Sequence, residues 1–71
     1  MENAFLNMTD EELIEALHNY ERWESTGAIP DHCALADVRD QYCDRNPAMG
    51  ILMLEKDLMR AVAKRWLKEH E

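Results

Sequence analysis

The chain has 71 residues, 15 of them acidic and 8 basic, which gives a formal net charge of −7 at pH 7. This length has room for one domain over residues 1–71, and a 46% apolar content is typical of a folded protein. An acidic surface repels phosphates, so the composition disfavours nucleic acid as a partner. No apolar run approaches the ~20 residues that cross a membrane, and the start of the chain lacks a signal-peptide pattern. We therefore expect a cytoplasmic protein with reduced thiols and no membrane partner.

The first predicted helix covers residues 10–25. Thr9 and Glu12 have the spacing of a capping box, in which each side chain satisfies a free backbone N–H group at the helix start. Gly27 suits the left-handed conformation that ends many helices. Between these signals, apolar residues recur at helical spacing and form one stripe: Leu13, Ala16, Leu17, Tyr20 and Trp23. The preceding segment, residues 1–8, is expected to pack on the helical domain.

Two further helices are predicted over residues 31–44 and 47–69. Pro30 cannot extend the first helix, and Asp31 after it is a favourable N-cap. In the second helix Leu35, Val38 and Tyr42 fall on one face with Ala34. The third helix begins where an Asn-Pro pair supplies a cap and a first helical residue.

The third helix has more apolar residues than two short partner helices would cover. At about 100° per residue one broad apolar face is predicted for the core, consisting of Ala48, Ile51, Leu52, Leu58, Met59, Val62, Ala63 and Trp66. Met49, Met53, Leu54 and Leu67 lie outside that face and are candidate partner-binding residues, as is Trp66 among its basic neighbours. This helix is therefore either the central element or half of an oligomer contact.

These elements predict an all-α fold, a compact three-helix bundle, antiparallel or orthogonal. A helix-turn-helix pair is the main alternative arrangement. A single core in a chain this small rarely supplies more than ~3–5 kcal/mol of net stability. Dimerisation through the third helix would add stability, so a homodimer is expected.

Glu55 is predicted to lie in the middle of the apolar face of the third helix. An unpaired carboxylate there would be costly, so it is a candidate buried polar residue that needs a partner such as Arg22, Arg39 or His18. A structural ion pair is favoured over a catalytic acid, because no second catalytic group has a recognisable spacing. A third alternative is a pairing with a basic residue of a partner protein.

The charge is divided unevenly along the chain. Residues 1–46 hold 11 acids and 3 bases, a balance of −8, whereas residues 47–71 hold 4 acids and 5 bases, a balance of +1. Acidic residues of the first helix, Glu11 and Glu15 among them, are therefore candidates for docking on a basic surface. A merely solubilising face is the alternative, and mimicry of nucleic acid is a further one.

No catalytic or cofactor-binding motif is present in the sequence. Cys33 and Cys43 are ten residues apart, and His32 adjoins Cys33 rather than following at a chelating spacing, so no zinc site is predicted. An enzyme, a bound metal and a bound cofactor are all disfavoured. We expect at least one thiol to be buried.

The sequence thus predicts a protein that acts by binding another protein, one with a basic or an apolar groove. It would be an inhibitor, an adaptor or an accessory subunit, and its size and acidity are typical of phage and mobile-element accessory proteins. The alternative is a dimeric helix-turn-helix regulator that binds DNA through the basic residues of the third helix, Lys56, Arg60 and Lys64.

Overall fold

The first helix, α1, spans Asp10–Thr26 and has the predicted signals at both ends. The computed structural model describes residues 3–44 and 46–70. The Glu12 N–H donates to Thr9 Oγ1 (3.2 Å), and the Thr9 N–H donates to Glu12 Oε1 (3.0 Å), which confirms the capping box. Gly27 has a φ of 77°, and its N–H donates to the Trp23 carbonyl (2.8 Å). The local sequence therefore determines where this helix begins and ends.

The second helix, α2, spans Ala34–Tyr42 and is shorter than predicted. Asp31 is not its cap. Cys33 is the N-cap, and its Sγ accepts a hydrogen bond from the Ala36 N–H (3.4 Å) while the thiol donates to the Pro30 carbonyl (3.4 Å). The prediction was wrong here because a buried thiol performs the role that usually belongs to an oxygen.

The third helix, α3, spans Pro47–His70, and Gly50 in its first turn lies against the last residue of α2, Tyr42. A Cβ on Gly50 would lie 2.2 Å from the Tyr42 carbonyl oxygen, so only glycine fits this contact. The contact orients α3 so that Gly50, Leu54, Leu58 and Ala61 face the core. The predicted core face was therefore right for Leu58, which is buried, and wrong for Ile51, Leu52, Met59 and Trp66, which are exposed.

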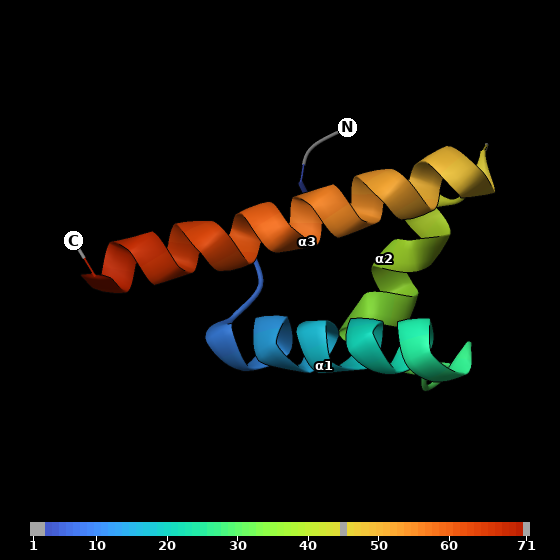
Figure 1. Ribbon diagram of the computed structural model, residues 1–71, viewed down its shortest axis with the longest axis horizontal. Coiled ribbons are helices and arrows are strands. Elements are labelled where there is room, and N and C mark those ends of the chain that lie inside the picture. The colour runs from blue at the N-terminus through green and yellow to red at the C-terminus, as the bar shows by residue number, and fades with distance from the viewer. Residues whose placement is uncertain (1–2, 45, 71) are drawn as a thin grey trace.

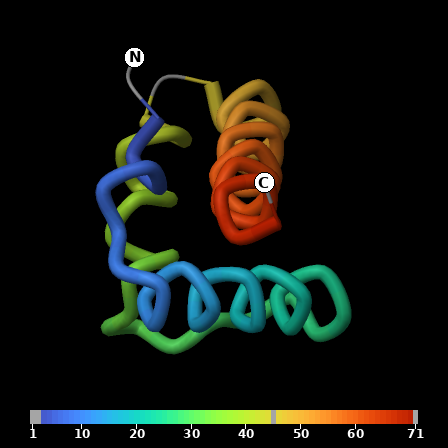
Figure 2. Tube along the Cα trace, turned by 90° about the vertical axis from the view of Figure 1, so that its left-hand side faces the viewer, coloured from blue at the N-terminus to red at the C-terminus, as the bar shows by residue number. Residues whose placement is uncertain are grey.

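The three helices confirm the all-α three-helix fold. α2 packs against both α1 and α3, whereas few contacts join α1 to α3. Figure 1 shows α3 and α1 as the two long elements with α2 between them, and Figure 2 views the molecule nearly along α3. In that second view α2 stands beside α3, α1 crosses below them, and no helix of the described chain covers the side opposite α2.

The N-terminal segment contributes to the core through Phe5. This ring is fully buried and stacks on Tyr42, with 6.1 Å between the ring centroids. Asn3 Nδ2 donates to the Asp57 carbonyl (2.9 Å), which joins the segment to α3. Residues from this segment and all three helices form one cluster: Phe5, Leu13, Ala16, Tyr20, Cys33, Leu35, Ala36, Val38, Tyr42, Leu54, Leu58 and Ala61.

Candidate protein-binding surface

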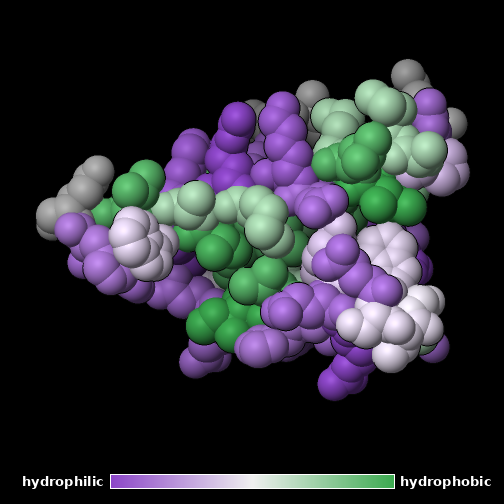
Figure 3. Space-filling view, viewed as in Figure 1, coloured by the Kyte–Doolittle hydropathy of each residue, from purple (hydrophilic) through white to green (hydrophobic). Residues whose placement is uncertain are grey.

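An apolar cleft of about 260 Å³ lies between α1 and the C-terminal half of α3. α2 does not reach this part of the two helices, as Figure 1 shows, so their facing side chains are only partly covered. Ile14 and Trp66 are the most open of the large apolar side chains in the lining, each 57% exposed. The cleft is lined by Asp10, Leu13, Ile14, Leu17, Val62, Arg65, Trp66 and Glu69. Figure 3 shows apolar side chains gathered on this side of the molecule, between α3 and α1.

Acidic side chains border the cleft on both helices. Asp10 of α1 and Glu69 of α3 are in its lining, and Glu11 and Glu21 lie one and two turns from Ile14 and are exposed. The single cation of the lining, Arg65, already pairs with the Asp10 carboxylate. The cleft therefore combines an apolar floor with a rim that favours a cationic partner.

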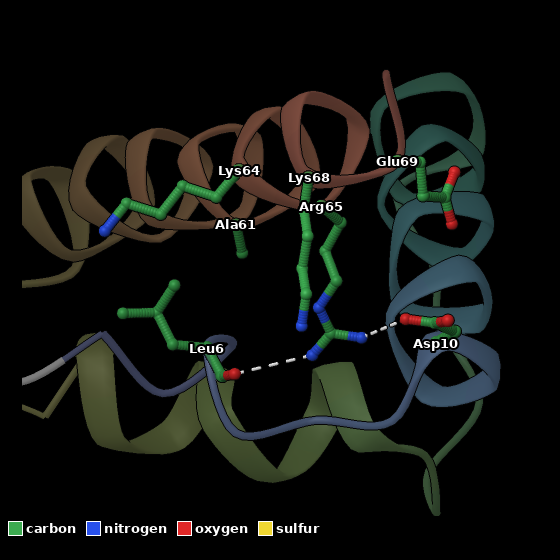
Figure 4. Close-up of a pocket in the computed structure, with 7 residues that line it drawn as sticks. All are labelled: Leu6, Asp10, Ala61, Lys64, Arg65, Lys68 and Glu69. Atoms are coloured by element: carbon green, nitrogen blue, oxygen red, sulfur yellow. Dashed lines mark hydrogen bonds and ion pairs between the residues drawn. The ribbon is translucent and has the colours of Figure 1, made fainter. Parts of the chain in front are cut away.

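Arg65 fixes the end of α3 against the start of α1. Its guanidinium donates to the Met8 carbonyl and the Asp10 carboxylate, and it reaches the Leu6 carbonyl at 3.4 Å. On the other side of Arg65 lies a second hollow of about 570 Å³, which also contains Lys64 and Lys68. Figure 4 shows the Lys68 ammonium beside the Arg65 guanidinium, whereas Lys64 points away from both. Because backbone carbonyls and a carboxylate occupy Arg65, its role here is structural.

The outer face of α3 is a second exposed apolar surface. Trp66 stacks on His70, with 4.2 Å between the ring centroids, and remains open to solvent. The large apolar side chains of α3 that stay exposed are Met49, Ile51, Leu52, Met53, Met59, Trp66 and Leu67. Ile51, Leu52, Met59 and Trp66 were all predicted for the core. They are exposed because the contact at Gly50 turns them away from it.

Among the sequence-predicted partner-binding residues, Leu54 is a correction. Its side chain is fully buried in the core and cannot contact a partner. The remaining candidates are exposed, namely Glu11, Glu15, Met49, Met53, Trp66 and Leu67, but the structure does not unite them in one patch. Trp66 lies in the α1–α3 cleft, whereas Met49 lies at the start of α3.

Glu55 is the other correction, because its side chain is exposed rather than buried. None of the predicted partners, Arg22, Arg39 or His18, forms an ion pair with it among the described residues. Glu55 instead acts on Tyr20 of α1: burial, followed by the negative charge and hydrogen bonding of Glu55, raises the pKa of Tyr20 to about 12. The partly buried acid of α3 is Asp57, which the sequence analysis did not select.

Both cysteines are free thiols, Cys33 buried and Cys43 half-buried. Within residues 3–44 and 46–70 no three His, Cys, Asp or Glu side chains lie close enough to share a metal ion. None of the helices in those ranges has the length and apolar content of a membrane span.

Ile14 and Leu17 line the cleft, but the sequence did not lead us to predict either of them as a partner-binding residue. Leu17 belongs to the predicted core stripe of α1, and Ile14 lies beside that stripe. The available signal was that Ile14 widens the apolar stripe of α1 on one edge, because such an edge can make a second contact.

In comparisons of the chain with protein-family models, curated proteins and solved structures, nothing matches.

Proposed function

We propose that the protein acts by binding another protein at the α1–α3 cleft, as an inhibitor, adaptor or accessory subunit. The observation that carries this proposal is an open apolar cleft between Ile14 and Trp66 with an acidic rim. Aromatic and aliphatic anchors in such a setting supply most of the binding energy of many protein interfaces. The matching ligand is an amphipathic helix that places one apolar side chain in the cleft and basic side chains around it.

The charge distribution supports a basic partner. Residues 1–46 carry a balance of −8, from 11 acids and 3 bases, and α1 contributes the rim of the cleft from this acidic part. Opposite charge speeds association and selects against acidic competitors. It also makes the association sensitive to salt, since exposed charges are screened beyond roughly 8–10 Å at physiological ionic strength.

The test uses an 18-residue amphipathic helix made of leucine and lysine and a matched peptide made of leucine and glutamate. The Trp23→Phe variant leaves Trp66 as the sole tryptophan, so its fluorescence reports on the cleft. We expect the lysine peptide to shift this emission to shorter wavelength with a micromolar Kd. The glutamate peptide should bind at least about tenfold more weakly, which corresponds to ~1.4 kcal/mol.

Ile14→Asp should abolish the response to the lysine peptide, because it puts a charge in the floor of the cleft. Gln41→Asp is the matched control, since it adds the same charge at an exposed position of α2 and should leave binding unchanged. Equal binding of the two peptides, or unchanged binding by Ile14→Asp, would contradict the proposal. The proposal would also be contradicted if the protein bound DNA and lost that binding when Lys56 and Arg60 were replaced by acidic residues.

A further inference from the structure

The outer face of α3 repeats with the spacing of a coiled-coil seam. Intervals of three and four residues alternate along this face, as they do at the a and d positions of a heptad. The seam runs opposite the buried residues Gly50, Leu54 and Leu58, and Leu52 within it is 61% exposed. Its seven positions are Met49, Leu52, Lys56, Met59, Ala63, Trp66 and His70. Met53 and Leu67, also exposed, lie directly beside it.

We propose that α3 pairs along this seam with α3 of a second copy of the chain, in a parallel two-stranded coiled coil. The charges beside the seam determine the direction. Glu55 lies on one flank, at a g position, and Arg60 lies on the other, at the e position five residues later. In a parallel pair a g residue meets the e residue five places further along the other helix. The exposed Glu55 carboxylate, which also interacts with Tyr20 of its own chain, therefore faces Arg60 of the partner subunit, and the two-fold axis repeats the pair.

An antiparallel pair is disfavoured by the same positions. It would bring e positions together with e positions and g with g, so Glu55 at a g position could not face Arg60 at an e position. The parallel pair also matches apolar flanking residues, because Val62 then faces Leu67 of the partner subunit. Lys56 occupies an inward a position, and a single lysine at such a position is a known means of fixing register.

Among the described residues, the ion pairs within one chain do not involve Lys56 or Arg60, so both cations can pair with a second copy. In residues 3–44 and 46–70 the ion pairs are Arg39 with Asp40 and Arg65 with Asp10. Lys56 and Arg60 are like charges four residues apart on the same helix, and Asp57, three residues before Arg60, accepts a hydrogen bond from the Tyr42 hydroxyl. The Glu55 position of the second copy provides a further acidic neighbour for Arg60. Figure 3 shows the hydrophilic side chains along one border of α3 next to the apolar band.

The dimer does not depend on the proposed function. The seam lies on the outer face of α3, whereas Ile14 and Leu17 of the cleft belong to α1. Trp66 is a seam position that also lines the cleft, and Val62 lines the cleft and flanks the seam, so both residues are left unchanged in the tests. The Ile14→Asp variant should dimerise as the unchanged chain does, which separates failure of one proposal from failure of the other.

The first test is sedimentation equilibrium over a range of protein concentrations. We expect a mass twice that of the 8.3 kDa chain. Glu55→Arg and Arg60→Glu should each weaken the dimer by roughly tenfold, since a repelling pair then occurs twice per dimer. The double variant should restore it. Lys64→Glu is the matched control, because Lys64 lies outside the seam and its flanks and lines the hollow beside Arg65. A monomer at all concentrations, or a double variant as weak as the singles, would overturn the proposal.

The second test determines the direction of the pair. Leu52→Cys places a thiol at an exposed seam position, where a parallel pair brings the two copies of residue 52 within disulfide distance. We expect rapid oxidation to a covalent dimer, while the unchanged chain, with Cys33 buried and Cys43 half-buried, stays uncrosslinked under the same conditions. A dimer that forms no disulfide at residue 52 would rule out the parallel arrangement. Circular dichroism of each variant checks that the helices are retained.

Discussion

The Tyr42 hydroxyl donates a 2.5 Å hydrogen bond to the Asp57 carboxylate, which ties the end of α2 to the middle of α3. The same hydroxyl accepts a hydrogen bond from the Ala4 N–H (3.3 Å), so it joins the N-terminal segment to both helices. Burial, followed by the hydrogen bond to Asp57, raises the pKa of Tyr42 to about 12. Hydrogen bonds to a charged acceptor are about twice as strong as neutral ones.

Removal of this hydroxyl should destabilise the fold. We expect Tyr42→Phe to lower the free energy of unfolding by about 2 kcal/mol, because the partly buried Asp57 carboxylate and the Ala4 N–H both lose a partner. Urea denaturation followed by circular dichroism measures the change. A loss below the error of the measurement would show that water replaces the hydroxyl without penalty.

Stability should fall at alkaline pH. Tyr20 and Tyr42 have pKa values of about 12 in the folded chain, against an ordinary value of 10.0. Between these values the folded state holds more protons than the unfolded state, so the free energy of unfolding falls as pH rises from 10 to 12. The contribution is complete below pH 10. Unfolding curves recorded across pH 9–12 should show this slope, and Tyr42→Phe should reduce it.

Gly50→Ala should be strongly destabilising although alanine is the better helix former. Helix propensity favours the change by about 1 kcal/mol. The new Cβ, however, would meet the Tyr42 backbone at 2.2 Å and would force α2 and α3 apart. We expect a net loss of about 2 kcal/mol, in the range of overpacked cores. Gly27→Ala is the comparison: it meets nothing within 4 Å and carries only the left-handed strain of about 1 kcal/mol. A Gly50 variant as stable as the unchanged chain would contradict the close approach.

Thr9→Ala should weaken the start of α1. The variant loses the N-cap hydroxyl that accepts from the Glu12 N–H, while residue 9 keeps the backbone N–H that donates to Glu12 Oε1. An N-cap deletion typically removes about 1 kcal/mol. Thr26→Ala is a matched change at the other end of the same helix. It removes a hydroxyl that donates to the Arg22 carbonyl (2.8 Å) and accepts from the Ala28 N–H (3.3 Å), both exposed contacts. Thermal melts should therefore rank Thr9→Ala below Thr26→Ala in Tm, and the reverse order would show that the cap contributes little.

Lysine at position 65 should not reproduce the contacts that Arg65 makes near the end of α3. The guanidinium serves the Met8 carbonyl and the Asp10 carboxylate at once, whereas an ammonium lacks the planar fork. We expect a loss of about 1 kcal/mol in the free energy of unfolding. Asp10→Asn should cost less, because Asp10 is largely exposed and surface ion pairs are weak. Equal losses in the two variants would indicate that the ion pair, and not the contact with the carbonyl, is what matters.

The sequence was most informative where one residue determines local backbone geometry. Thr9, Gly27 and Pro47 mark helix limits through capping, a left-handed conformation and a fixed φ, and the structure confirms the helices that they predict. These effects act within a turn or two. No partner elsewhere in the chain is needed to infer them.

The rotation of α3 could not be predicted in that way. Apolar residues occupy most of its circumference, so periodicity alone did not favour Leu54 over Leu52 for the core. The choice depends on the contact between Gly50 and the Tyr42 backbone, a tertiary approach that the pattern does not encode. The same contact explains why Glu55 was misplaced and Asp57 missed. Of the exposed candidates, only Trp66 lines the cleft, because the position of α1 against the C-terminal half of α3 is also set by tertiary contacts.

The middle helix has a consequence for fragments of the chain. α2 contains only nine residues, yet both longer helices pack on it more than on each other. An isolated helix of fewer than ~12 residues is marginal in water, so α2 is helical only while its neighbours are docked. Cutting the chain on either side of α2 therefore leaves α2 with one neighbouring helix and the other long helix without α2. Neither α1 with α2 nor α2 with α3 should persist as a folded half, and the protein should gain or lose its structure as one unit.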